Sequence, residues 1–290
     1  MALTVTTNTT SLGVQKNLNR ASDALATSMT RLSSGLKINS AKDDAAGLQI
    51  ATRMTSQIRG QTMAIKNAND GISIAQTAEG AMQEQTNMLQ RMRELALQAR
   101  NDSNSFKDRD ALNGEFQSML EEINRVADST ELNGKKLLSG AAGTMTFQVG
   151  SNGGTGNQIQ ITLSAAVNSS SSGVLKALGS NSSIAMTTTA MAPSAYDALF
   201  QKVITGIDDA LQAINSTRAQ LGAAQNRLTS TINNLQNINE NAEAARGRVQ
   251  DTDFAAETAQ LTKQQTLQQA STSVLAQANQ LPSAVLKLLG

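Results

Sequence analysis

The chain has 290 residues, of which 39% are hydrophobic, 16% charged and 2% aromatic, and its net charge is +1. Because it contains no cysteine and no histidine, disulfides, most zinc sites and the usual Ser-His and Cys-His catalytic pairs are excluded, and we expect neither enzyme activity nor a metal or cofactor. The balanced charge gives no reason to expect a nucleic-acid or membrane partner, and no stretch approaches the roughly 20 apolar residues that a membrane span needs.

A first helix is predicted after Thr10. It ends at a break marked by Gly35 and Asn39. Apolar and small residues recur along it at alternating spacings of four and three, at Leu18, Ser22, Leu25, Met29, Leu32 and Leu36. Such a stripe is typical of a helix that packs lengthwise against another helix.

A second, long helix is predicted over residues 41–99. Ser40 and Asp43 have the spacing of a capping box at its start. A cation site formed by Asp43 and Asp44 is the alternative to this helix start. Three glycines dilute the apolar stripe, and we interpret them as points where another helix approaches closely, at Gly60, Gly71 and Gly80. Methionines at 82, 88 and 92 fill a core or, alternatively, form an adaptable binding surface.

The middle of the chain is predicted to hold a third helix and a β-hairpin. The helix covers residues 107–129, and the sequence ELNG at 131–134 predicts a turn. Two alternating runs then predict the strands, with apolar residues at Met145, Phe147, Val149, Ile159, Ile161 and Leu163. The intervening GSNGGTG predicts the hairpin tip; a phosphate loop is the alternative, but no Lys-Ser/Thr follows it and a strand, not a helix, comes next.

Helix is predicted again over residues 194–239 and 252–289, with a less regular stretch at 240–251 between them. A heptad pattern runs through the first of these helices at Ile207, Leu211, Ile214, Leu221, Leu228, Ile232 and Leu235, interrupted by Arg218 and Gln225. A second heptad pattern runs through the last helix at Leu267, Ser271, Val274, Ala278, Leu281, Val285 and Leu288.

These elements predict a mainly α fold: a long antiparallel helical bundle or coiled coil formed by the N- and C-terminal regions, with a small β-hairpin in the middle. The terminal helices carry too few large aliphatic side chains to offset the conformational entropy of ordering them. We therefore expect neighbouring copies to complete the burial of a subunit-packing set, which comprises Leu18, Leu25, Met29, Leu32, Leu36, Leu267, Val274, Leu281, Val285 and Leu288.

The segment that includes the predicted hairpin and the stretch after it is polar and almost uncharged. Residues 139–193 contain no Asp or Glu and a single lysine, Lys176. A surface loop is the simplest interpretation. O-linked glycosylation is an alternative at Ser169, Ser170, Ser171 and Ser172.

Two long terminal blocks resemble bacterial flagellins. The N-terminal block is NTTSLGVQKNLNRASDALATSMTRLSSGLKINSAKDDAAGLQIATRM, and the C-terminal block contains LGAAQNRLTSTINNLQN and SVLAQANQLPSAVLKLL. The resemblance covers residues 1–165 and 195–290 and implies a secreted, extracellular structural subunit that self-assembles into the flagellar filament for swimming motility. Terminal helices at 1–40 and 250–290 would form the inner tube, called D0, and residues 41–165 with 194–249 the surrounding D1 layer. Residues 166–193 would be a short variable insertion in place of large outer domains.

The resemblance also implies partners: other copies of the chain, the flagellar export apparatus and a secretion chaperone, and the filament cap and junction proteins. The absence of a general secretory signal at the N-terminus agrees with such export. The stretch QRMRELALQARN resembles the region through which a host Toll-like receptor detects flagellin, and it implies a receptor patch of Arg91, Leu95 and Glu115. A hook–filament junction protein is the alternative within this class. An enzyme-bearing flagellin and a plain coiled-coil adaptor are the alternatives outside it.

Overall fold

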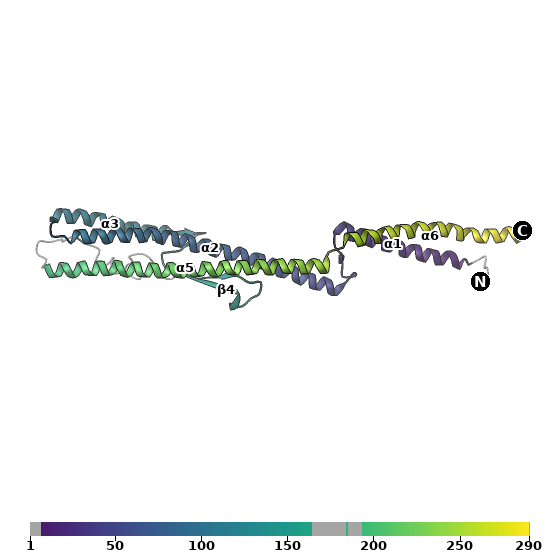
Figure 1. The fold of residues 1–290 in the computed structure, drawn as a ribbon, viewed down its shortest axis with the longest axis horizontal. Coiled ribbons are helices and arrows are strands. Elements are labelled where there is room, and N and C mark those ends of the chain that lie inside the picture. The colour runs from purple at the N-terminus through teal and green to yellow at the C-terminus, as the bar shows by residue number, and fades with distance from the viewer. Residues whose placement is uncertain (1–6, 164–183, 185–192, 290) are drawn as a thin grey trace. The chain divides into compact units, whose positions relative to one another are not determined.

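The protein is known from a computed structural model, which describes residues 7–163, 184 and 193–289 (Figure 1). Residues 1–58 together with 240–290 form one compact unit, and residues 59–239 form the second. In chain order the elements are α1 (Thr9–Ser34), α2 (Ala45–Ala99), α3 (Phe106–Ser129), β1 (Glu131–Leu132), β2 (Lys135–Lys136), β3 (Gly143–Gln148), β4 (Gln158–Leu163), α5 (Pro193–Gln250) and α6 (Phe254–Leu289). The predicted fold class, mainly α with a small hairpin in the middle, is confirmed. The predicted glycosylation positions, Ser169 to Ser172, lie outside the described residues.

Helix α1 begins and ends close to the predicted positions. The Asn8 side chain accepts a hydrogen bond from the Ser11 backbone N–H at the start of the helix. Gly35 follows the last turn with φ 74°, and its N–H donates to the Arg31 carbonyl. This left-handed conformation favours glycine, which is why the helix ends there.

Helix α2 begins four residues later than the sequence indicated. Ser40 and Asp43 do bond each other, at 3.0 Å between their side chains, but they close a turn that precedes the helix. The helix start is capped instead by Asp44, whose side chain accepts a 2.9 Å hydrogen bond from the Gly47 N–H. The prediction that Ser40 and Asp43 form a capping box at the start of the helix was therefore wrong, because the neighbouring Asp44 caps the helix.

Two short antiparallel pairs follow α3. The β1–β2 pair turns at Asn133 and Gly134, whose φ values of 52° and 75° suit the tight turns of hairpins. The β3–β4 pair has the register Met145↔Ile161 and is the hairpin that the alternating pattern predicted. Its inner face, including Ile159, Ile161 and Leu163, is buried against the helices.

Helix α5 is longer than predicted. It continues without interruption to Gln250, so the less regular stretch expected at 240–251 is helix for all but its last residue. The segment ENAEAARGRV is rich in Ala, Glu and Arg, which are strong helix formers, and a single Gly247 is tolerated among them. After the break at 251–253, the Asp253 side chain caps α6 by accepting from the Ala255 N–H at 2.9 Å.

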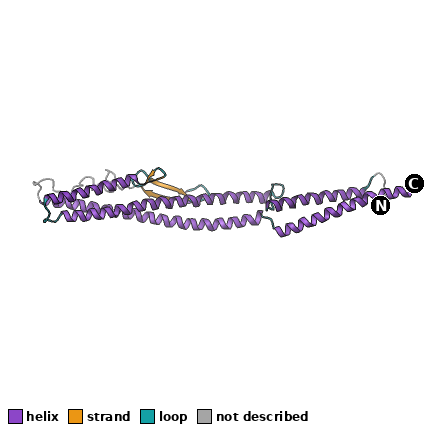
Figure 2. Cartoon of the chain, turned by 90° about the horizontal axis from the view of Figure 1, so that it is seen from above, coloured by secondary structure: helices purple, strands orange, loops and turns teal. Residues whose placement is uncertain are grey.

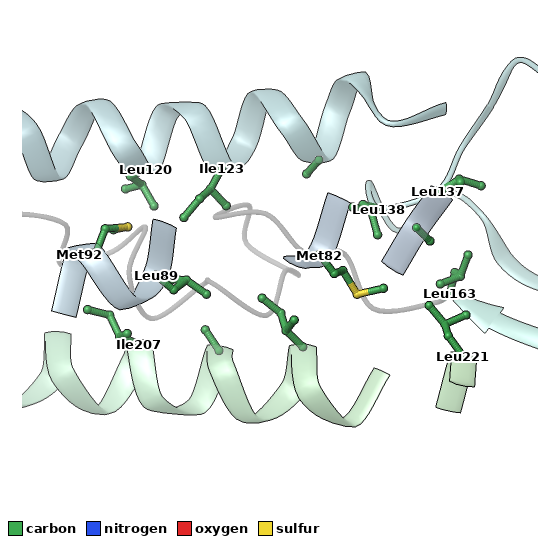
Figure 3. Packing of buried hydrophobic residues seen from close by; sticks show 14 of the residues in the cluster. Met82, Leu89, Met92, Leu120, Ile123, Leu137, Leu138, Leu163, Ile207 and Leu221 are labelled. Carbon is green, nitrogen blue, oxygen red and sulfur yellow. The ribbon is translucent and has the colours of Figure 1, made fainter. Parts of the chain in front are cut away.

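The core of the second unit lies between α2, α3, α5 and the hairpin (Figure 3). The first predicted heptad pattern is the α5 side of this core: Ile207, Ile214, Leu221, Leu228 and Leu235 are all buried. Met82 and Met92 are fully buried and Met88 is partly buried, so the methionines fill the core.

The two polar interruptions of that heptad pattern meet one carboxylate on α2. Gln225 Nε2 donates to Glu79 Oε2 at 2.9 Å, and Arg218 forms an ion pair with Glu79 Oε1 at 3.9 Å. Both residues occupy equivalent heptad positions, seven apart, so one acidic residue contacts both. The interruptions are thus a paired polar layer within the seam.

The prediction that another helix approaches closely holds at one of the three glycines, Gly71. A Cβ at Gly60 would lie 2.9 Å from the Ser151 Cβ, and one at Gly71 would lie 3.2 Å from Leu228 and 3.3 Å from Phe147. At Gly80 nothing lies within 4 Å. Gly71 is approached by α5 and by the hairpin, whereas Gly60 is approached by the hairpin loop and not by a helix. The prediction for Gly80 was wrong.

Candidate subunit-packing site

The terminal helices α1 and α6 lie side by side and antiparallel in both views (Figures 1 and 2). At one end the Lys37 N–H donates to the Gln250 carbonyl at 2.7 Å. At the other end Asn8 Nδ2 donates to the Ala278 carbonyl at 2.8 Å. Polar contacts therefore close the helix pair at both ends.

Small and polar residues occupy the centre of the contact between these helices. Ala21 and Ser28 of α1 and Gln264 and Ala278 of α6 are buried. Half-buried side chains flank them on the same faces, at Val14, Leu18, Leu25, Leu32, Leu261, Gln268, Ser271 and Leu275. Small residues let two helices approach closely, but they bury little apolar surface.

Large hydrophobic side chains remain outside this contact. Met29 and Leu12 on α1 are 57% and 58% exposed, and Phe254, Leu267 and Val274 on α6 are 57%, 44% and 46% exposed. Single exposed hydrophobic residues are normal in soluble proteins. Here five of them lie on two paired helices that bury mainly alanine, serine and glutamine in their own centre, which indicates a surface for another chain.

The predicted packing residues divide into three groups. Leu18, Leu25, Leu32 and Leu36 are half-buried within the chain. Met29, Leu267 and Val274 are exposed. The side chains of Leu281, Val285 and Leu288 lie outside the described residues, although the backbone of α6 runs through them. The role of the whole set in subunit packing stays a prediction.

The seam inside the chain differs from the predicted stripes. The stripes placed Ser22, Met29, Leu267 and Val274 in the contact, whereas all four are exposed. On α6 the contact instead follows Leu261, Gln264, Gln268, Ser271, Leu275 and Ala278. The contact therefore pairs rows of small residues with rows of leucines, and it turns Met29, Leu267 and Val274 away from the partner helix.

The predicted receptor patch is only partly assembled on one surface. Arg91 Nη2 and Nε donate to Glu115 Oε1 at 2.9 and 3.1 Å, and Nη1 reaches Glu94 at 3.3 Å. These hydrogen bonds, the Glu115 bond first, raise the pKa of Arg91. Leu95, by contrast, is fully buried in the core. The expectation that Leu95 shares the exposed patch was therefore wrong, because the face it occupies on α2 packs inward.

A polar cluster with no signal in the sequence lies where the α2–α3 loop meets the start of α5. The Arg109 guanidinium stacks 5.1 Å from the centre of the Tyr196 ring and bonds the Asn101 carbonyl at 3.3 Å. Tyr196 donates to the Ala99 carbonyl at 3.2 Å, and burial raises the pKa of its hydroxyl. Arg100 pairs with Asp197 at 3.1 Å. These contacts tie the loop to α5, and they join residues about 90 positions apart, beyond the reach of local sequence patterns.

The described residues contain neither a cluster that could hold a metal ion nor a membrane-spanning helix. Among them no group of three or more acidic, histidine or cysteine side chains is placed to hold a metal ion. None of the helices, over their described residues, is both long enough and apolar enough to cross a membrane. The exposed hydrophobic residues on α1 and α6 remain the main candidate site.

Comparison with known proteins finds matches at both ends of the chain. Residues 5–143 match the family model for the bacterial flagellin N-terminal helical region, and residues 204–289 match that for the bacterial flagellin C-terminal helical region. Flagellin B of Vibrio anguillarum is 41% identical over 376 aligned positions, covering 100% of both chains. Polar flagellin A of Vibrio parahaemolyticus is 39% identical, again over 100% of both chains.

Two further points come from these comparisons. At least 86 of the 376 positions aligned with the V. anguillarum protein (376 less 290) have no residue in this chain, so that relative carries segments that are absent here. A solved structure assigned as a flagellar hook-associated protein from Vibrio parahaemolyticus has a TM-score of 0.61 at 15% identity and covers 72% of this chain and 100% of that one. At that identity the likeness concerns the fold alone.

Proposed function

The chain belongs to the bacterial flagellin family, and from this premise we propose that it is a short-form structural subunit that self-assembles into the flagellar filament for swimming motility. The observation that carries the proposal is the set of exposed hydrophobic side chains on α1 and α6. A helical polymer would cover them with neighbouring copies. The curated relatives described above are named as flagellins, which favours a filament subunit over a hook–filament junction protein.

We assign residues 1–40 and 250–290 to the inner layer of the filament and residues 41–165 with 194–249 to the layer around it. The division into two compact units supports an assignment of this kind, although the unit boundaries fall at 58 and 240. Residues 166–193 would be the short variable insertion, although Ile184 within it is buried in the core. The protein would act without catalysis, as a structural element.

The assembly surface is tested by changing only residues that are exposed in the single chain. The double variant Leu267→Ser and Val274→Ser removes two large exposed side chains from α6. We expect the isolated protein to keep its helix content, because exposed positions change stability by about 0.5 kcal/mol or less, while seeded polymerisation fails. Circular dichroism and electron microscopy measure the two effects.

A matched control is Gln265→Ser with Thr272→Ser, which alters two exposed polar positions on the same helix. Filaments should form from the control as from the wild type. Removal of residues 281–290 should likewise leave the remaining helices folded and abolish assembly. Normal filaments from both the double variant and the truncated chain would overturn the proposal.

We further propose export by the flagellar apparatus with a secretion chaperone, contact with the cap and junction proteins at the filament ends, and an extracellular location. The family resemblance supports these partners. They are tested by pull-down of the monomer from flagellated cells and by finding the protein in sheared filaments. Its retention in the cell body of a strain that assembles other filaments would oppose export.

A host Toll-like receptor is also proposed as a partner, through the surface formed by Arg91 and Glu115. An arginine held at a patch centre is a frequent hot spot of protein interfaces. Support comes from the exposure of both side chains, 46% and 42%, and from their ion pair. Leu95 would act indirectly, by packing the helix beneath them. A receptor-reporter assay of monomeric Arg91→Ala against wild type measures this role; equal activation at limiting dose would remove it.

A further inference from the structure

The seam between α1 and α6 contains one charged residue from each helix. Every other residue of α1 and α6 that is buried or half-buried, over the described stretches 9–34 and 254–280, is uncharged. The two exceptions are Arg31 and Glu257, and they face each other with 3.6 Å between Arg31 Nη1 and Glu257 Oε2. Their side chains are 30% and 13% exposed, so both charges are largely removed from water.

Each of these charges also suits its place on its own helix. Arg31 lies in the last turn of α1, and Glu257 lies in the first turn of α6. A cation near a helix C-terminus and an anion near a helix N-terminus are both stabilised by the backbone dipoles. The Arg31 Nε and the Glu257 Oε1 are buried without a hydrogen-bond partner, so the ion pair is the main compensation that these two groups have for leaving water.

The rest of the seam repeats every seven residues. Two rows of residues alternate along α1 and its C-cap. One row is mainly small: Val14, Ala21, Ser28 and Gly35. The other is mainly leucine: Ser11, Leu18, Leu25 and Leu32. On α6 the row containing Gln264, Ser271 and Ala278 alternates with Leu261, Gln268 and Leu275. If α6 slid by seven residues, similar rows would face each other again. Apolar packing alone therefore discriminates poorly between alignments one heptad apart.

Backbone bonds at the adjoining end do not remove this ambiguity. The bridge between Leu36 and Asp251 uses main-chain groups, which are present at every residue. At the far end Asn8 Nδ2 also donates to a main-chain carbonyl, that of Ala278, and the side-chain bond from Ser11 to Asn279 is exposed, so water can replace it. The ion pair is different, because a slipped helix would leave the largely buried Glu257 opposite a neutral residue.

We propose that the Arg31–Glu257 ion pair sets the register of the terminal helix pair and thereby fixes where the exposed side chains of α1 lie relative to those of α6 when a neighbouring copy packs on them. A slip of seven residues would move Leu267 and Val274 by roughly 10 Å along the helix axis relative to Met29 and Leu12, at 1.5 Å per residue. Arg31 and Glu257 are thus positioning residues for assembly. The inference rests on the proposed filament function and adds the contact that specifies it.

The test is a charge-swap cycle of Arg31→Glu, Glu257→Arg and the double variant. Because the chain has no cysteine, spin labels can be attached selectively to Ser22→Cys and Gln277→Cys, both at exposed positions. The interlabel distance reports the register, both in the monomer and in filaments where labelled chains are diluted among unlabelled wild-type chains. The concentration needed for seeded polymerisation is the second readout.

Each single swap should broaden the interlabel distance or shift it by about 10 Å, and raise the concentration needed for polymerisation by about tenfold or more. The double variant should restore the wild-type distance and most of the polymerisation. Restoration will be incomplete, because each swapped charge opposes its own helix dipole. The matched control is Arg20→Glu, an exposed arginine of α1 for which no ion pair is found among the described residues; it should change neither readout.

Two results would overturn the inference. One is an unchanged distance and unchanged polymerisation in the single swaps. The other is a double variant as impaired as the singles, which would show that the side chains matter for their shape and not for their pairing. Failure of the proposed function is distinguishable, since in that case the wild-type protein itself would form no filaments.

Discussion

At Arg91 and Leu95 the exposure of two neighbouring side chains separates an interaction residue from a packing residue. Arg91 is 46% exposed and is held by Glu115 and Glu94. Leu95, one helical turn away, has no exposed surface and belongs to the core cluster. Substitutions at these two positions should therefore act by different physical routes, even though the residues are only four apart.

We expect Leu95→Ala to lower the free energy of unfolding by about 2–5 kcal/mol, because it leaves a cavity in a packed core. Arg91→Ala should lower it by less than about 1 kcal/mol, since exposed ion pairs contribute little. Urea unfolding followed by circular dichroism measures both values. The exposed leucine of the same helix, Leu97, 49% exposed, provides the control: Leu97→Ala should resemble Arg91→Ala. Equal losses at Leu95 and Leu97 would contradict the burial described here.

The start of α3 provides a residue whose protonation is linked to a cap. Ser105 and Asp108 form a capping box, and hydrogen bonds from the Ser105 side chain and backbone lower the pKa of Asp108 below its ordinary 3.8. A lowered pKa means that the ionised form is favoured in the folded state. The contribution of this cap is therefore complete above the ordinary pKa and is lost as the pH falls through the lowered value.

Ser105→Ala should raise the pKa of Asp108 back toward 3.8 and make the first turn of α3 less sensitive to acid. Carbon-detected NMR titration of the Asp108 carboxyl group gives the pKa directly. Asp43, whose pKa is lowered by hydrogen bonds from Ser40 and not by this box, is the internal reference: its pKa should be the same in both proteins. A pKa of Asp108 that does not move would show that the box does not form in solution.

In helix α2 the surroundings of each glycine decide whether glycine or alanine is the more stable residue there. Gly60 and Gly71 lie against the hairpin and, at Gly71, also against α5, whereas Gly80 meets no atom within 4 Å. Intrinsic helix propensity favours alanine over glycine at all three positions. Tertiary packing therefore reverses that preference at some positions and leaves it intact at another.

Alanine substitution of these glycines should give opposite signs within one helix. Gly80→Ala should raise the free energy of unfolding by roughly 0.5–1 kcal/mol, the propensity difference alone. Gly60→Ala should lower it by about 1–3 kcal/mol, because the new methyl group meets the Ser151 Cβ and backbone and overpacks the contact. Gly71→Ala should fall between them. Thermal or urea unfolding of the three variants measures the order, and a stabilising Gly60→Ala would contradict the close approach of the hairpin tip.

At the scale of the whole molecule, the chain combines an assembly surface with a short intervening segment. Its flagellin relatives align over their full length but carry positions that this chain lacks. Residues 166–190 contain one charged residue, Lys176. A segment with this composition has little means of forming a core of its own, and the flanking elements β4 and α5 have buried faces of their own.

Replacing residues 166–182 with a short Gly-Ser linker should therefore preserve both assembly and motility. Ile184 is kept in this variant, because its side chain is buried in the core and its N–H donates to Asn113 Oδ1 at 2.9 Å. The variant also keeps residues from Pro193 onward, where α5 begins, and so keeps the hydrogen bond from the Tyr196 hydroxyl to the Ala99 carbonyl. Filament length by microscopy and swimming speed in a flagellin-deficient strain are the measurements. Loss of filaments while export continues would show that the segment takes part in packing between subunits.

The sequence by itself determined the fold class, most of the helices, the hairpin and the family. These follow from local periodicity, from turn residues such as Gly35 and from the amino-acid sequence of two long terminal blocks. The sequence also indicated that the ends need outside partners, because they carry too few large hydrophobic residues to offset the entropy of ordering them.

Only the tertiary structure decided which side of each helix faces inward. It placed Leu95 in the core, put Met29, Leu267 and Val274 on the outside and joined Arg218 and Gln225 to Glu79. It also paired Arg31 with Glu257 across 226 positions of the chain (257 less 31). A heptad pattern repeats every seven residues whichever alignment is adopted, so register and partner depend on long-range packing and on where single charges meet, and local periodicity contains neither.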